Sequence, residues 1–293
     1  MICAVSRSAG ERGAQLAGRR RPRARLGAPV PYLGGALRDA FDGWLAELVS
    51  RHGRELEFRE IRKGVQALSS LYVERRDEAG ALGARALDGR GKRAALATYY
   101  APLHFVTVCH ALSQIGVERF GPISEVHDLG CGTGAAGAAA AFALGGRARV
   151  AGVDRSGFLL AEARRTWAAF RLPARARRGR LPGSLPRAAA GQLWVLGWAV
   201  NEMDDSTQTE LLAALAGALE GGARLLVLEP LASPATPWWP TWTRALGARG
   251  VEDGALRVPV TLPEWLARLD RAAGLDHGVL GARLLAGPLA ASP

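Results

Sequence analysis

The sequence predicts an α/β fold with a doubly wound sheet, helices on both of its faces and a helical segment ahead of it. The main observation is that, after Gly121-Pro122, short apolar runs alternate with amphipathic stretches of helical spacing, as in strands joined by crossover helices. A second is the glycine-rich turn from Asp128 to Gly134, placed between the first apolar run and a small-residue helix over Ala135 to Ala143. Together they predict a core domain over residues 119–293.

The strands expected in this domain are short apolar runs, typical of strands that are buried on both faces. They are Glu125–Leu129, Arg149–Val153, Leu193–Gly197, Arg224–Leu228 and Val279–Leu285. Residues 158–170 and 207–220 carry apolar side chains at three- and four-residue steps and are expected to be crossover helices. Thr207 with Glu210 has the spacing of a capping box that would begin the second of them.

Ahead of the core domain, residues 31–118 have a helical pattern. Apolar side chains at three- and four-residue steps begin with Leu37 and end with Leu48, and further helices are expected near 57–76 and 92–116. We therefore predict an N-terminal helical region over 31–118.

Residues 1–30 hold seven arginines and are predicted to be a flexible Arg-rich tail. The formal net charge of +11 suits a nucleic-acid partner, because clustered cations release counterions from phosphates. Only Lys63 and Lys92 are lysines, however, so the arginine bias equally fits GC-rich coding. An RNA-contacting arm and a solvated N-terminus both remain open.

Cysteine usage and hydropathy exclude several classes of protein. Cys3, Cys109 and Cys131 are too few and too widely spaced for a disulfide framework or a four-cysteine zinc site. The longest apolar run, Gly134 to Gly146, is shorter than the roughly 20 residues that a membrane span needs. We expect a cytoplasmic protein without a membrane segment or a metal site.

The turn from Asp128 to Gly134 has the composition of a ligand-binding loop. Glycines without Cβ atoms allow main-chain N–H groups to approach a ligand closely, and the N-terminus of the following helix carries partial positive charge. Twenty residues after Gly134, the second strand ends in Asp154, whose carboxylate can accept hydrogen bonds from ribose hydroxyls. Loop and acid together indicate a cofactor that contains adenosine.

Two cofactors fit this pattern. Residues 132–137 match the G-x-G-x-x-G fingerprint of dinucleotide sites, so an NAD-dependent oxidoreductase is one alternative. Asp128 stands immediately before Leu129 and the first glycine, and its carboxylate would attract the cationic aminoacyl group of S-adenosylmethionine (SAM) and repel a pyrophosphate. Asp128 therefore favours SAM.

Over residues 98–287 the chain resembles the class I SAM-dependent methyltransferase family. The matching stretches are VHDLGCGTGAAGAA, VAGVDRS, LWVLGWAVNEMDD and LEGGARLLVLEP. The resemblance implies a Rossmann-like sheet, SAM as cofactor and methyltransferase activity. The cofactor-binding residues that it implies, together with their motif neighbours, are Asp128, Gly130, Cys131, Gly132, Gly134, Asp154, Arg155, Gly197 and Asn201.

Within that set, Asp128 and the glycines Gly130, Gly132 and Gly134 would line the methionine part of SAM, and Asp154 its ribose. Gly197 and Asn201 would lie near the reacting sulfonium. The chain departs from the family pattern at Gln192, before the fourth strand, and at Gly179-Arg180, where the family often has an acid that contacts adenine.

A second resemblance concerns ATYYAPLHF, the NEMDD turn and VLEPLASP, which are similar to the methyltransferase-like family associated with assembly of the small ribosomal subunit. It implies an RNA- or ribosome-associated methyltransferase or assembly factor as the alternative function. Members of that family usually carry a cysteine cluster after the fifth strand, whereas no cysteine follows Cys131 here. No metal is therefore predicted.

Candidate substrate residues are Tyr100, His104, Glu202 and Trp238. Each has a structural alternative: core packing for the tyrosine, an ordinary hydrogen-bonded position for the histidine, helix entry for Glu202 and cover for the sheet for Trp238. No general base is assigned. The leading interpretation is a SAM-dependent methyltransferase with an unidentified acceptor, such as a small molecule.

Overall fold

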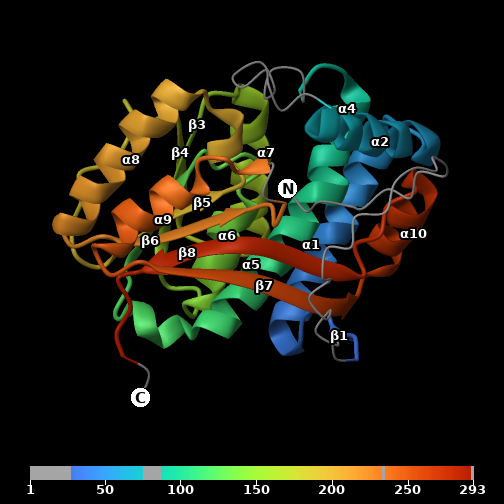
Figure 1. Cartoon of the computed structure of the whole chain (residues 1–293). Helices are drawn as coiled ribbons and strands as arrows, with labels where there is room; N and C mark the ends of the chain where they lie inside the picture. The colour runs from blue at the N-terminus through green and yellow to red at the C-terminus, as the bar shows by residue number, and fades with distance from the viewer. Residues whose placement is uncertain (1–27, 75–86, 233–234, 292–293) are drawn as a thin grey trace, which may run out of the picture.

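The computed structural model describes residues 28–74, 87–232 and 235–291. The predicted Arg-rich tail lies outside these ranges except for residues 28–30. Within the described residues, the chain forms one sheet whose eight strands follow the order β1-β7-β8-β6-β5-β2-β3-β4 (Figure 1). The strands are β1 (Val30–Pro31), β2 (Glu125–Leu129), β3 (Arg149–Asp154), β4 (Ala174–Arg178), β5 (Gln192–Gly197), β6 (Arg224–Glu229), β7 (Glu252–Thr261) and β8 (Val279–Gly287).

The central strands are parallel, and β8 lies antiparallel between β6 and β7. The chain passes from β2 outward through β3 to β4, and then returns to add β5 on the other side of β2. This reversal of strand order places a crevice at the carboxyl ends of β2 and β5, where doubly wound sheets bind their ligands.

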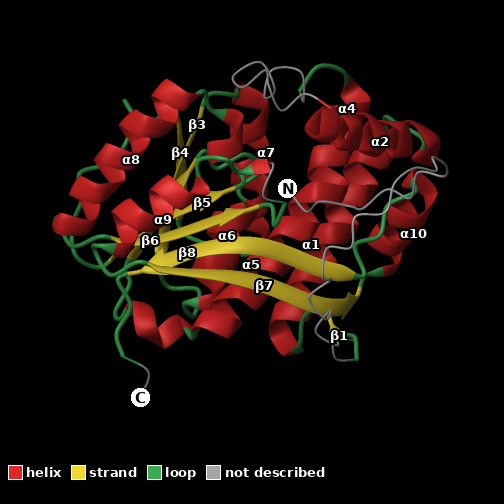
Figure 2. Ribbon diagram, in the orientation of Figure 1, coloured by secondary structure: helices red, strands yellow, loops and turns green. Residues whose placement is uncertain are grey.

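The helices pack on both faces of the sheet, as predicted. Their bounds are α1 (Gly35–Gly53), α2 (Phe58–Glu74), α4 (Arg90–Ala95), α5 (Ala101–Ile115), α6 (Ala135–Ala143), α7 (Gly157–Ala169), α8 (Asp205–Glu220), α9 (Trp239–Gly247) and α10 (Glu264–Ala273). Short helical turns η1 (Leu96–Tyr100), η2 (Val117–Phe120) and η3 (Val200–Glu202) complete them. Figure 2 shows α5 and α6 behind the strands β7 and β8.

Alternate residues of each central strand enter two separate hydrophobic cores, because successive side chains of a strand point to opposite faces. In β5, Leu193 and Val195 pack with α1, α5 and α6, whereas Trp194 and Leu196 pack with α8 and α9. All four side chains are at most 2% exposed. This double burial explains why the strand reads as a continuous apolar run.

The N-terminal helices share the first of these cores with the sheet. Phe41 and Trp44 of α1 contact Phe105 of α5, and α2 lies beside α10 from the far end of the sequence (Figure 1). The division at residue 118 between a helical region and a core domain stays a prediction, since one hydrophobic core includes residues from both sides of it.

The predicted strands and helices of the core domain are present, and the α/β Rossmann-like fold class is confirmed. The prediction that Thr207 and Glu210 form a capping box at the start of this helix was wrong. Helix α8 begins at Asp205, and its N-cap is Asp204, whose Oδ1 accepts a hydrogen bond from the N–H of Thr207. The helix expected near 92–116 is interrupted by the π-helical turn η1. Strands β1, β4 and β7 had no predicted bounds.

Candidate functional site

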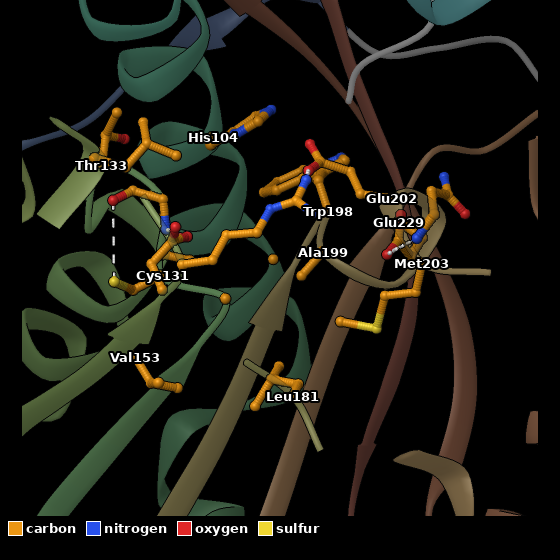
Figure 3. A pocket seen from close by; sticks show the side chains of 18 of the residues that line it. His104, Cys131, Thr133, Val153, Leu181, Trp198, Ala199, Glu202, Met203 and Glu229 are labelled. Atoms are coloured by element: carbon orange, nitrogen blue, oxygen red, sulfur yellow. Dashed lines mark hydrogen bonds and ion pairs between the residues drawn. The ribbon is translucent and has the colours of Figure 1, made fainter. Parts of the chain in front are cut away.

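A cavity of about 530 Å³ opens at the carboxyl ends of β2, β3, β5 and β6, in the size range of small-molecule sites. Its walls come from the glycine-rich turn at residues 128–134, called the glycine loop below, and from the turns after β3, β4 and β5. The turn η1 and the segment before α9 complete them. Figure 3 shows Cys131 and Thr133 on one side of the cavity and Glu202, Met203 and Glu229 on the other, with Trp198 between them.

The glycine loop turns bare main chain toward the cavity. Gly130 and Gly132 both line it, with φ angles of +72° and +52° that side-chain-bearing residues rarely adopt. A Cβ atom added to Gly132 would meet no atom within 4 Å, whereas one added to Gly130 would lie 2.9 Å from the Cβ of Ala199. A ligand can therefore approach the backbone at Gly132 closely.

Asp154 ends β3 beside this loop and also lines the cavity. Its Oδ2 accepts a hydrogen bond of 3.0 Å from the N–H of Gly132, and its Oδ1 accepts one of 2.8 Å from the N–H of Ser156. Burial raises the pKa of this carboxyl group against those hydrogen bonds. Each carboxylate oxygen has a second lone pair, so Asp154 can brace the loop and still accept hydrogen bonds from a ligand.

Two residues of the predicted cofactor set do not line the cavity. Asp128 is 1% exposed, and its Oδ2 accepts a hydrogen bond of 2.9 Å from the N–H of Gly137 in α6. The carbonyl of Gly134 accepts a hydrogen bond of 2.9 Å from the indole of Trp167. Both residues support the loop from behind and are not among the residues that line the cavity, and their contact with the methionine part of SAM stays a prediction.

Burial also governs the chemistry of Asp128 and Cys131. It raises the pKa of Asp128 to about 8, although the hydrogen bond from Gly137 opposes the shift. Cys131 lines the cavity but is only 5% exposed, and burial raises the pKa of its thiol well above the ordinary value. A thiolate nucleophile is therefore disfavoured there.

The turn after β5 places a flat aromatic pair at the cavity. Gly197 and Trp198 line it, and the indole of Trp198 stacks on the imidazole of His104 with ring centroids 3.8 Å apart and planes within 8°. Trp198 holds a left-handed φ of +55°, which is strained for a bulky residue. Burial lowers the pKa of His104 well below its usual range, so the imidazole is neutral at physiological pH.

The remaining predicted site residues also line the cavity. The indole N–H of Trp238 donates to the side-chain oxygen of Asn201 at 3.1 Å, which holds the tryptophan over the turn after β5. Across the cavity, Arg155 and Glu202 form a long ion pair of 3.9 Å. Tyr100 is presented by the π-helical turn, a distortion that often occurs at functional sites.

Glu229 was missing from the predicted set. It ends β6, lines the cavity and has no exposed surface. Its Oε1 accepts hydrogen bonds from the N–H groups of Val200 (2.9 Å) and Asn201 (3.4 Å), whereas its Oε2 is buried without a partner among the described residues. Burial raises its pKa to about 7. The available signal was an acid at the end of an apolar strand, the same signal that identified Asp154.

The described residues lack two other features that would indicate a function. Within them, no group of three or more His, Cys, Asp or Glu side chains is arranged to hold a metal ion. No helix in the same ranges is both long and apolar enough to cross a membrane.

Comparisons with known proteins give matches only among solved structures. No family model and no curated protein matches the chain. A mitomycin 7-O-methyltransferase matches with 14% identity and a TM-score of 0.47, over 86% of this chain and 76% of its own. The precorrin-6y C5,15-methyltransferase of Geobacter metallireducens matches with 14% identity and a TM-score of 0.42, over 62% and 85%.

An O-methyltransferase from neocarzinostatin biosynthesis, solved with S-adenosyl-L-homocysteine and 1,4-dihydroxy-2-naphthoic acid, matches with 17% identity and a TM-score of 0.43. That match covers 76% of this chain and 69% of the other. At this level of similarity, the function has to be inferred from the geometry of the cavity.

Proposed function

We propose that this chain is a SAM-dependent methyltransferase that acts on a small-molecule acceptor. The observation that supports it best is the joint position of Gly132 and Asp154: bare main chain and a carboxylate from the adjacent strand face one cavity at the reversal point of the sheet. That pairing suits a nucleoside with an amino-acid end.

The residues present fit this cofactor. The missing Cβ of Gly132 leaves room for the methionine part, and Asp154 has acceptor capacity for the ribose hydroxyls. Gly197 ends β5 and Asn201 follows it, and both line the cavity. In this proposal, Arg155 and Leu181 border the end of the cavity near β3 and β4, where adenine would lie.

The environment of Asp128 favours SAM over a dinucleotide. In a dinucleotide site, the N–H groups at the start of the first helix face a pyrophosphate. Here the N–H of Gly137 in the first turn of α6 already donates to Asp128, and the carboxyl group lies beneath the loop. The helix terminus is thus partly satisfied by the protein itself, which leaves one N–H group fewer for a pyrophosphate.

When bound, SAM supplies a methyl group on a good leaving group, so the protein mainly has to orient the acceptor and exclude water. The stacked rings of His104 and Trp198 and the indole of Trp238 provide a rigid aromatic wall for an acceptor. Neutral His104 adds no charge to that wall.

Ligand-induced stabilisation tests the proposed function directly. Because a ligand that binds only the native state raises the unfolding midpoint, SAM and S-adenosyl-L-homocysteine should raise the melting temperature and NAD should not. Isothermal titration calorimetry should then give one site per chain for the two SAM-type ligands. Stabilisation by NAD alone would identify a dinucleotide enzyme instead.

A further inference from the structure

The proposed function gives no role to Glu229, a buried carboxyl group in the wall of the cavity. It lies across the cavity from the glycine loop, with Trp198 between them (Figure 3). It is fully buried, and its two carboxylate oxygens differ: Oε1 fixes the turn at Val200 and Asn201, whereas Oε2 has no partner in the part of the chain that the structure describes. Leaving a buried carboxylate oxygen without a partner is costly, which indicates a ligand group that completes it.

The side chains around Glu229 define what kind of group that is. On the same side of the cavity, Glu202 and Asp204 follow β5 and add further negative charge. The arginines of the lining, Arg155 and Arg180, follow β3 and β4, and Arg155 reaches Glu202 in the 3.9 Å ion pair. At this end of the cavity the three carboxyl groups of Glu229, Glu202 and Asp204 face one arginine, although the chain as a whole carries a net charge of +11. The excess of acidic groups suits a cation rather than an anion.

We propose that Glu229 faces the point where the methyl group leaves SAM, and that it holds a protonated amine of the acceptor there and takes its proton. The inference rests on the proposed function and deepens it by naming the acceptor class. A residue with this role touches the reacting atoms and is a catalytic residue.

The reaction balances with the groups present. An ammonium nitrogen has no free electron pair, so one proton first passes from nitrogen to Oε2 of Glu229. The freed pair then forms the bond from nitrogen to the methyl carbon while the bond from carbon to sulfur breaks. The products are an N-methylated ammonium and S-adenosyl-L-homocysteine, and Glu229 releases its proton to solvent. A pKa raised to about 7 by burial makes this carboxylate a better proton acceptor than an exposed glutamate.

Sinefungin tests the position of Glu229 without knowledge of the acceptor. This SAM analogue carries an amine at the place of the transferable methyl group, whereas S-adenosyl-L-homocysteine has nothing there. We expect calorimetry on the full chain to show sinefungin binding roughly 10- to 100-fold more tightly than S-adenosyl-L-homocysteine, the scale of a hydrogen bond to a charged group.

In Glu229→Gln, this preference should fall to within about threefold, while affinity for S-adenosyl-L-homocysteine is retained, because the amide oxygen can still accept from Val200 and Asn201. Glu229→Asp, which keeps the charge with a shorter reach, should restore part of the preference. Glu220→Gln is the matched control: it neutralises an exposed carboxylate at the end of α8, paired with Arg249, and should leave both affinities unchanged.

The outcomes separate the two proposals. An undiminished sinefungin preference in Glu229→Gln would overturn the role of Glu229 and leave SAM binding intact. Loss of S-adenosyl-L-homocysteine binding in a folded Glu229→Gln would also overturn it, because Glu229 would then act only by holding the turn. If the wild type binds neither ligand, the proposed function itself is wrong and the inference fails with it.

Discussion

At the scale of single residues, Asp154 connects the glycine loop to the cavity. Its two oxygens accept from the backbone at Gly132 and Ser156, and their remaining lone pairs are available to ribose. Side-chain removal should therefore affect both the loop and the ligand.

We predict that Asp154→Ala weakens binding of S-adenosyl-L-homocysteine by about 1–3 kcal/mol, the scale for hydrogen bonds to a charged group. Calorimetry on the folded variant measures the change. Asp39→Ala, which removes an exposed carboxylate on α1, is the control and should bind like the wild type. Equal affinities for all three proteins would remove Asp154 from the site.

Gly132 gives a second prediction at this scale. A valine here would extend into the open space above the loop and would also be strained at a φ of +52°. Gly132→Val should therefore abolish ligand binding detectable by calorimetry. Gly121→Val is also strained, at a φ of +70° and a ψ of −166° that glycine alone adopts readily, and it has open space around its Cβ, but Gly121 does not line the cavity. It should bind normally, and equal loss in both variants would implicate strain alone.

Many residues that line the cavity could be predicted from the sequence because they lie in contiguous motifs. Gly130, Gly132 and Asp154 follow strands whose apolar runs are easy to recognise. The positions of Asp128 and Gly134 behind the loop depend on how α6 and Trp167 pack, which local pattern does not specify. Only one oxygen of Glu229 is hydrogen-bonded, because the turn that donates to it lies 28 residues earlier in the chain. A local sequence pattern does not specify such a contact.

At the scale of elements, the strands that sequence reasoning left without bounds are those that do not resemble buried strands. β4 is the sequence ARARR at the edge of the sheet, with exposed side chains. Its arginines discourage pairing with another chain. β7 contains Gly254 and Pro259, which both weaken a strand pattern. Each of these strands is defined by its hydrogen bonds to a neighbouring strand, β3 for β4 and β8 for β7. An alternating pattern of apolar residues does not identify either of them.

Helix starts were also difficult to locate. Ser156 is the N-cap of α7, and its hydroxyl oxygen accepts from the N–H of Leu159 at 3.3 Å. Ser156→Ala should lower the free energy of unfolding by about 1 kcal/mol, measured by urea denaturation. Ser50→Ala, on an exposed position of α1, is the control and should be neutral or slightly stabilising because alanine favours helix. A neutral Ser156→Ala would show that this cap contributes nothing.

At the scale of the whole molecule, buried acids link stability to pH. Burial raises the pKa of Asp128 to about 8 and that of Glu229 to about 7. Each of these two carboxyl groups is therefore more protonated in the folded chain than in the unfolded chain between about pH 4 and its raised pKa. Below about pH 6.5, the lowered pKa values of His104, His110 and His127 act in the opposite direction, so the two acids dominate from about pH 6.5 to pH 8. By linkage, the free energy of unfolding falls as pH rises through this window, by up to about 1.4 kcal/mol per pH unit for each proton. The pKa of Glu162 is lowered to about 2, because hydrogen bonds with His52 and Arg51 outweigh the effect of burial. Below about pH 4.5, Glu162 therefore makes the free energy of unfolding rise with pH.

We predict that Asp128→Asn flattens this dependence, because asparagine keeps an acceptor for Gly137 and cannot ionise. Urea denaturation at several pH values from 5 to 8 measures the slope. Asp39→Asn, at an exposed position, should retain the wild-type slope. If the free energy of unfolding fell with pH equally steeply in the wild type and in Asp128→Asn, groups other than Asp128 would cause the pH dependence.

The antiparallel strand β8 has a consequence for how the chain reaches this structure. It pairs with β6 on one side and β7 on the other, and β1 joins the sheet only through β7. During synthesis, the apolar margin of β6 therefore stays uncovered until residues 279–287 have left the ribosome. A nascent chain halted before that point would present an unpaired strand edge for aberrant pairing, so β8 completes the sheet between β6 and β7.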